Sequence, residues 1–380
     1  MLKYTSIQLA LLSITLLLAF SSCAGWFMKV KKDADIVVAD GSKQFHNSLS
    51  FVADAHADPL MRGKKLWRNN SMHVNFPKMR EGNVALQIFG VVTKSGVPKM
   101  DFNKEPKVNM LGVAFPGLMF KKAFKKGLFQ IGKLHKAEKK DDKFHIIQTK
   151  ADLEELVKLR EKDNAHIGGM LCIEGIHCIK DSIEKLDELY NKGVSIIGLS
   201  HFFDNRYAGS QSGMKKYGLT EKGIQLIEKI NDLGLLIDLA HASENTIDSV
   251  LKFSKKPPII SHVGCAHVQD SPRNLNDEYL KKIMDKGGIV GVMFFNPLKR
   301  KAPDIHKIAD NIMHLVKLNN GNAQNISLGS DYDGMTIVPF DISELHMLTH
   351  ILLERGMPQT DVELIMGENL KTFFLENLPG

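Results

Sequence analysis

The chain has 380 residues, of which 43% are hydrophobic and 24% charged, and its formal net charge is +7. This length allows one large domain or two ordinary ones, and the composition excludes a disordered chain, a collagen-like fibre and a protein with many membrane spans. The four cysteines are too few for a fold built on disulfide bonds.

The N-terminal segment has the pattern of an export signal. Lys3 precedes an apolar stretch over residues 7–20, and the small residues 21–24 follow it. The last part of this stretch also resembles a bacterial lipoprotein signal, in which Cys23 is the lipidated residue. The alternative is an uncleaved anchor, because the apolar stretch continues to about residue 30 and so has roughly the 20 residues that a spanning helix needs.

Both interpretations place the protein in the same compartment. Residues 1–30 are an export signal or membrane anchor, and residues 31–45 are a linker. We therefore expect a body that lies outside the cytoplasm and is tied to a membrane, as a lipoprotein or through its N-terminal anchor.

The remaining chain, residues 46–380, alternates apolar strands with amphipathic helices. Helix patterns occupy residues 151–162, 180–192, 220–233 and 277–286, and Thr220 is a predicted N-cap of the third. Short apolar stretches with little polar alternation, typical of strands buried on both faces, occupy residues 49–53, 84–91, 166–173, 194–199, 235–239, 258–260, 288–294 and 326–328. This alternation predicts one α/β domain, a (β/α)8 TIM-type barrel.

A lysine-rich insertion follows the second predicted strand, within residues 95–150. Its segment 121–143 has nine lysines and three acidic residues. We interpret it as a solvent-exposed loop or helix face, and its alternative role is contact with an anionic membrane surface. Nucleic-acid binding is not expected, because such surfaces spread basic residues along a groove and interleave aromatic ones.

Side chains that bind metals lie at the ends of six predicted strands. Taken singly, each is more often a hydrogen-bonded structural residue or part of a turn. Taken together, they would crowd one rim of a parallel barrel with carboxylates and imidazoles, and bound divalent cations would offset that cost. Their mixture of nitrogen and oxygen donors suits zinc better than calcium. These residues are His56, Asp58, Glu174, His201, His241, His262, Asp331 and Asp333.

The same segments resemble the membrane (renal-type) dipeptidase family of zinc peptidases, over about residues 46–375. The matching motifs, in chain order, are Asp-Ala-His-Ala-Asp at 54–58, Ile-Glu-Gly at 173–175, Gly-Leu-Ser-His-Phe-Phe-Asp-Asn at 198–205, Ile-Asp-Leu-Ala-His-Ala-Ser at 237–243, Ser-His at 261–262 with Arg-Asn at 273–274, and Gly-Ser-Asp-Tyr-Asp-Gly at 329–334.

This resemblance implies a centre with two zinc ions on the (β/α)8 barrel. His56 and Asp58 would bind one ion, and His241 and His262 the other. Glu174 would bridge the two ions through its two carboxylate oxygens.

The resemblance also implies the reaction. A hydroxide that bridges the two zinc ions would attack the peptide bond of a dipeptide. His201 would contact the substrate near the scissile carbonyl and stabilise the oxyanion. Arg273 would hold the substrate's carboxylate or carbonyl end, and Asp331 would transfer the proton to the leaving amine. The substrates would thus be short peptides, and since members of the family often form dimers, a homodimer is one assembly that the resemblance allows.

Other residues near these motifs have weaker expectations. Asp238 and Asp333 are candidates for orienting their neighbours. Cys172, Cys178 and Cys265 fit no zinc-finger spacing, and we expect them to be buried apolar residues.

Two other functions stay open at this stage. One is a different amide or lactone hydrolase with two metal ions on the same barrel, since a fold does not determine a substrate. The other is a non-catalytic surface binding protein that contains metal.

Overall fold

A computed structural model describes residue 30 and residues 36–94, 122–294, 304–334 and 337–380. Its centre is one parallel sheet in the order β2-β1-β9-β8-β7-β6-β5-β4-β3, which closes because β2 also pairs with β4. The strands are β1 (Val52–Ala57), β2 (Val84–Val92), β3 (Phe144–Ile146), β4 (Ile167–Glu174), β5 (Val194–Gly198), β6 (Leu236–Asp238), β7 (Ile259–Val263), β8 (Ile289–Val292) and β9 (Ile326–Leu328).

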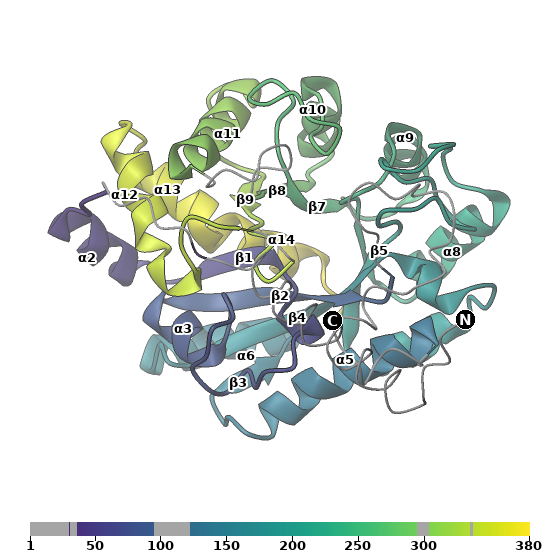
Figure 1. The fold of residues 1–380 in the computed structure, drawn as a ribbon, viewed down its shortest axis with the longest axis horizontal. Coiled ribbons are helices and arrows are strands. Elements are labelled where there is room, and N and C mark those ends of the chain that lie inside the picture. The colour runs from purple at the N-terminus through teal and green to yellow at the C-terminus, as the bar shows by residue number, and fades with distance from the viewer. Residues whose placement is uncertain (1–29, 31–35, 95–121, 295–303, 335–336) are drawn as a thin grey trace, which may run out of the picture.

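Helices surround this barrel (Figure 1). The α-helices are α2 (Asp40–Ser48), α3 (Phe76–Glu81), α5 (Ala123–Glu138), α6 (Lys150–Lys162), α7 (Lys185–Tyr190), α8 (Glu221–Asp232), α9 (Glu244–Phe253), α10 (Asp277–Asp285), α11 (Ile305–Leu318), α12 (His346–Glu354), α13 (Gln359–Glu363) and α14 (Asn369–Asn377). Single turns of 3-10 helix are η1 (Pro59–Met61), η3 (Ile176–Ile179) and η4 (Ile342–Glu344), and η5 (Leu364–Glu368) is π-helical.

The predicted (β/α)8 barrel is therefore confirmed. Eight strands, β1, β2 and β4–β9, form the closed ring, and the short β3 pairs with the first half of β4. Thr220 caps α8 as predicted, since its side chain accepts a hydrogen bond from the backbone N–H of Gly223 at 3.0 Å.

Some boundaries differ from the prediction. The first strand covers Val52–Ala57 rather than 49–53, so Asp54 and His56 lie inside it. The strand accommodates Asp54 because Ser330 and Gln87 donate hydrogen bonds to its carboxylate at 2.7 and 2.9 Å. The helix predicted at 180–192 is only α7, and β3 was not predicted.

Two apolar layers hold the barrel together. Inside the ring, Ala53 and Ala55 of β1 and Ile88 of β2 pack in one buried cluster with Phe373 and Phe374 of α14. Alternate strand residues face outward and pack in a second cluster against the surrounding helices. Because apolar side chains fill the ring, the polar residues of the strands collect at the carboxyl ends of the strands.

The lysine-rich segment is largely the solvent-exposed face that was expected, since its described lysines 122, 125, 136, 139 and 140 are exposed. Its described part forms α5, in the connection between β2 and β4, and Lys126 is buried there. The Lys133 ammonium donates to the carbonyl oxygen of Leu60 at 2.6 Å and also to that of Arg62. Burial and the neighbouring Arg62 lower the pKa of Lys133 to about 8. Lysine stems are long enough to carry a charge through an apolar contact to a buried carbonyl.

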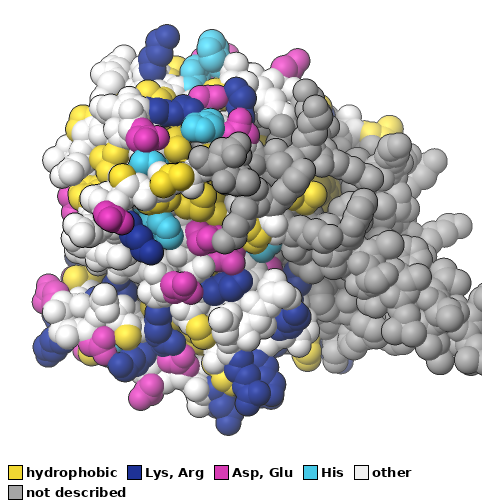
Figure 2. Space-filling model, turned by 60° about the vertical axis from the view of Figure 1, so that its left-hand side comes forward, with side chains coloured by type: hydrophobic (Ala, Val, Ile, Leu, Met, Phe, Trp, Pro, Cys, Tyr) yellow, Lys and Arg dark blue, Asp and Glu magenta, His cyan; other side chains and the backbone are white. Residues whose placement is uncertain are grey.

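The predictions for the N-terminal segment and for contact with a membrane remain predictions. The export signal or anchor lies almost entirely outside the described residues. Helix α2 begins at Asp40, inside the segment expected to be a linker, and packs against α12. Within the described ranges, no helix is long and apolar enough to cross a membrane. Figure 2 shows basic, acidic and histidine side chains interspersed over one face, so that face presents both signs of charge.

Candidate active site

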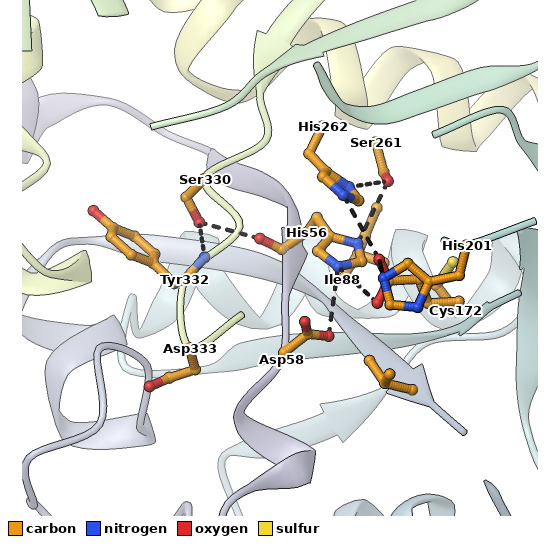
Figure 3. A network of polar contacts seen from close by, with 12 residues as sticks. His56, Asp58, Ile88, Cys172, His201, Ser261, His262, Ser330, Tyr332 and Asp333 are labelled. Atoms are coloured by element: carbon orange, nitrogen blue, oxygen red, sulfur yellow. Dashed lines mark hydrogen bonds and ion pairs between the residues drawn. The ribbon is translucent and has the colours of Figure 1, made fainter. Parts of the chain in front are cut away.

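The predicted metal ligands meet at the carboxyl end of the barrel, where Figure 3 shows His56, Asp58 and His262 side by side. His56 lies in β1 and Asp58 directly follows it, while Glu174 is the last residue of β4. His241 follows β6, and His262 lies in β7. All five side chains are at most 5% exposed.

His56 and Asp58 form one side of this cluster. His56 Nε2 lies 3.5 Å from Asp58 Oδ1, and neither atom has a hydrogen-bond partner. Gly90 of β2 provides the space, because a Cβ at this position would lie 2.2 Å from Asp58 Oδ1.

Glu174 lies between the two sides. Its Oε2 is 3.8 Å from His56 Nε2 and has no hydrogen-bond partner. Its Oε1 is 3.0 Å from His241 Nε2 and 3.7 Å from His262 Nε2. Burial and the nearby Asp58 carboxylate raise the pKa of Glu174 well above its usual range. The carboxylate therefore presents one oxygen to each side, as a bridging ligand must.

His262 is oriented by a chain of hydrogen bonds. The Ser261 hydroxyl donates to Asp238 Oδ2 at 2.5 Å, so Ser261 Oγ accepts from His262 Nδ1 at 2.9 Å. The proton of the neutral His262 ring is thus on Nδ1, which leaves a lone pair on Nε2. Such hydrogen bonds to the outer nitrogen are typical of metal-binding histidines. The orienting role predicted for Asp238 fits this chain, whereas the part of Ser261 was not foreseen.

His201 and Arg273 lie beside the second group of histidines. His201 Nε2 is 3.4 Å from Glu174 Oε1, and Arg273 Nη2 is 3.5 Å from His241 Nε2. The Arg273 guanidinium also donates to the carbonyl oxygen of His262 at 2.9 Å. Burial lowers the pKa of His201 to about 4, despite its hydrogen bond to a backbone carbonyl.

A hydrogen bond to the backbone sets the tautomer of the neutral His201 ring. Its Nδ1 lies 2.9 Å from the carbonyl oxygen of Lys94, which can only accept, so Nδ1 carries the proton of the neutral ring. Nε2 then presents a lone pair toward the site. Donation from Nε2 to an oxyanion, the role that the sequence implied, would need the protonated ring.

Asp331 lies on the side of His56 and Asp58. A carboxylate oxygen of Asp331 is within 4.8 Å of ligand atoms of both residues. Its backbone N–H donates to the carbonyl oxygen of His56 at 3.1 Å, and its φ is +58°. Burial is the main cause that raises the pKa of Asp331 to about 8.

The other residues singled out earlier lie outside the cluster of ligands. Asp333 accepts hydrogen bonds from the backbone N–H groups of His73 and Val74, both at 3.0 Å. It therefore anchors the loop that carries Asp331. The three cysteines Cys172, Cys178 and Cys265 are free and buried, as expected.

The donor set fits divalent cations. Lone pairs on ring nitrogens and unpaired carboxylate oxygens repel one another unless a positive charge lies between them. In this site the carboxylates of Glu174 and Asp58 raise the pKa of His56 to about 10 against the effect of burial, which shows how strongly the position favours a cation. His56, Glu174 and His262 form one set of possible ligands, and Glu174, His201 and His241 form another.

Solved structures with the same fold include several peptidases. A metallopeptidase from Rhodobacter sphaeroides, bound to a phosphinate mimic of the dipeptide L-Ala-D-Ala, superposes with a TM-score of 0.72 at 21% identity, covering 86% of this chain and 99% of that one. A probable dipeptidase from Pseudomonas aeruginosa superposes with a TM-score of 0.74 at 19% identity, covering 89% of this chain and 98% of that one. At these identities the likeness supports the fold.

Curated relatives are closer in sequence. A dipeptidase of Clonostachys rogersoniana is 31% identical over 239 residues, which cover 61% of this chain and 60% of that protein. An uncharacterized dipeptidase of Schizosaccharomyces pombe is 33% identical over 213 residues, covering 54% of this chain and 52% of that protein. The aligned part thus spans less than two thirds of either relative.

The model of one protein family matches nearly the whole body of the chain, over residues 42–374. This range includes all the ligands described above. The chain belongs to the membrane dipeptidase family, peptidase family M19.

Proposed function

We propose that this protein is a zinc-dependent dipeptidase that holds two ions and hydrolyses the peptide bond of dipeptides. The observation that carries the proposal is the placement of Glu174, whose two oxygens face different groups of ring nitrogens. Membership of the membrane dipeptidase family supports it, as do relatives named as dipeptidases.

The ligand set indicates which ions it would hold. His56 and Asp58 would hold one ion and His241 and His262 the other, with Glu174 shared between them. Imidazole nitrogens combined with few carboxylates favour zinc or a similar metal over calcium and magnesium. Ions bound there would supply the Lewis acidity that activates a water molecule and polarises the peptide carbonyl.

Arg273 would select short substrates. Its guanidinium reaches the rim between His241 and His262, at fixed distances from both. A planar guanidinium pairs with a carboxylate through two parallel hydrogen bonds. A terminal carboxylate held there would lie one residue from the reacting carbonyl in a dipeptide, so longer peptides would not fit the same arrangement.

Asp331 and His201 would act on the substrate from opposite groups of ligands. Asp331, beside His56 and Asp58, would accept the proton of the attacking water on its carboxylate and pass it to the leaving amine. His201 would contact the substrate through the lone pair on Nε2, as an acceptor for a substrate N–H group.

The test is turnover of a panel of dipeptides, tripeptides and lactones by the full chain. We expect dipeptide hydrolysis that is lost after chelation and restored by added zinc, with two ions bound per chain. Turnover of lactones or other amides, with no dipeptide cleaved, would instead support a different hydrolase on this barrel. A folded protein that binds zinc and cleaves none of these compounds would support a binding protein.

A further inference from the structure

A second cluster of metal-binding side chains lies apart from the active site. Among the described residues, four groups of three side chains have ligand atoms within 4.8 Å of one another, and three of these groups consist of active-site residues. The fourth group is His267, Asp277 and His314. The chemistry proposed for the active site uses none of these three residues, so it does not account for their meeting.

Three different elements supply this cluster. His267 lies in the loop between β7 and α10, Asp277 is the first residue of α10, and His314 lies in α11. The N-cap of α10 is Asn276, whose side chain accepts a hydrogen bond from the backbone N–H of Tyr279 at 3.2 Å. The Asp277 carboxylate is therefore not needed as a cap, and it accepts a hydrogen bond from His314 Nε2 at 2.8 Å.

The two imidazole rings of the cluster lie face to face. The ring centroids of His267 and His314 are 4.3 Å apart, and the ring planes differ by 9°. Two positive charges stacked at this distance would repel each other. The stack therefore favours at least one neutral ring, which is the form in which an imidazole binds a metal.

A modest adjustment would give these side chains the spacing of metal ligands. Bonds of about 2.0–2.2 Å with tetrahedral angles place the ligands of a zinc ion about 3.3–3.6 Å from one another. His314 Nε2 and Asp277 Oδ1, now 2.8 Å apart, would separate slightly when an ion replaces the proton between them. The ring of His267 is exposed, so it can turn out of the stack and direct a nitrogen at the same ion.

We propose that His267, Asp277 and His314 form a peripheral metal site, which binds zinc or a similar divalent cation separately from the active site. Two imidazoles and one carboxylate favour such metals over magnesium and calcium, which prefer oxygen ligands. The proton displaced from His314 Nε2 passes to solvent, and water completes the coordination of the ion.

An ion in the peripheral metal site would fasten the loop that carries Arg273. This loop, residues 264–276, already contacts α11, because the backbone N–H of Cys265 donates to Asn311 Oδ1 at 2.7 Å. The ion would add a second link, from His267 in the same loop to both α10 and α11. The peripheral metal site is thus a clamp on the backbone that positions Arg273.

Counting bound zinc tests the site. The full chain would be dialysed against zinc alone, over a range of concentrations, as the wild type and as the variants His267→Gln and His314→Gln. The matched control is His306→Gln, an exposed histidine of α11 outside the cluster. Wild type and control should bind one more ion per chain than either variant, or bind that ion at least about 10-fold more tightly.

Hydrogen exchange tests the clamp. The backbone amides of residues 264–276 should exchange more slowly in the wild type once the additional ion is bound, and His267→Gln should lack this change. Equal zinc binding by the wild type and both variants would overturn the inference, and so would a loop whose exchange does not respond to the ion. The comparison counts a difference of one ion, so its result is independent of dipeptide turnover and of the number of ions in the active site.

Discussion

The two ends of the barrel both contain buried histidines, but the hydrogen bonding of these residues differs. At the carboxyl end of the strands, the inner nitrogens of His56, His241 and His262 face one another and Glu174. At the opposite end, His46 of α2 has both nitrogens bonded, to Thr349 Oγ1 at 2.8 Å and to the carbonyl oxygen of Gly82 at 3.1 Å.

This difference shows why burial alone does not identify a metal ligand. His46 is as buried as His56, with an exposed fraction of 0% for both. A buried ring whose two nitrogens are both hydrogen-bonded to the protein needs no ion. Buried lone pairs and charged oxygens that face one another repel, and a cation bound between them removes this repulsion. The two ends therefore differ because His56 Nε2, Asp58 Oδ1 and Glu174 Oε2 have no hydrogen-bond partner, and that difference can be tested by mutation.

The largest effect should come from Glu174→Gln, which keeps the size of the side chain and removes its charge. We expect turnover to fall more than about 100-fold, because losing even an outer partner of a metal ligand typically costs 10- to 100-fold. The metal-free variant should be more stable than the metal-free wild type, because it no longer buries this carboxylate. Dipeptide turnover and thermal unfolding with and without zinc would measure both effects.

Glu376→Gln, at an exposed position of α14, is the control for this change and should behave as wild type. Full turnover by Glu174→Gln would remove Glu174 from the bridge. It would also mean that the histidines at the carboxyl end need a cation no more than His46 does, and the proposed function depends on that difference.

A smaller effect should follow from Gly90→Ala. The added Cβ would lie 2.2 Å from Asp58 Oδ1, so that carboxylate must move away from His56. We expect one of the two ions to bind about 10- to 100-fold more weakly, with turnover falling in parallel. Zinc content at limiting metal concentration would measure it.

Gly132→Ala supplies the matched control within α5, where a Cβ would have no atom within 4 Å. That change should stabilise the helix by about 0.5–1 kcal/mol and leave zinc binding unchanged. Equal zinc affinity in Gly90→Ala and wild type would show that the position of Asp58 is not needed to hold the ion.

The sequence predicted the barrel and the strand ends that carry the candidate ligands because both follow from local patterns, whereas the assignment of these residues to two ions came from the family resemblance. Apolar stretches define strands buried on both faces, and the carboxyl ends of parallel strands must share one rim. The same reasoning missed Gly90 and Ser261, whose importance comes from side chains far away in the chain. It also misplaced β1, since nothing within residues 49–53 shows that Ser330 and Gln87 will satisfy Asp54.

The smallest predicted effect concerns His46, the buried histidine at the opposite end of the barrel whose two nitrogens are both hydrogen-bonded. Burial lowers the pKa of His46 from 6.5 to about 4. The unfolded chain therefore binds a proton more readily between these values, so the folded state loses stability as the pH falls through this window. Between pH 7 and 5 the loss from this residue should be about 2 kcal/mol.

His46→Gln should remove this pH-dependent loss of stability while keeping a hydrogen-bond donor near the carbonyl oxygen of Gly82. The variant is expected to be less stable than wild type at pH 7, because Thr349 loses its partner, but to lose about 2 kcal/mol less between pH 7 and 5. Urea unfolding of both proteins at the two pH values measures the difference, and metal loss at low pH cancels since both keep the same ligands. His306→Gln, at an exposed position on α11, controls for removal of a histidine as such. Equal losses in wild type and His46→Gln would mean that folding does not lower the pKa of His46, and the distinction drawn between the histidines at the two ends would fail.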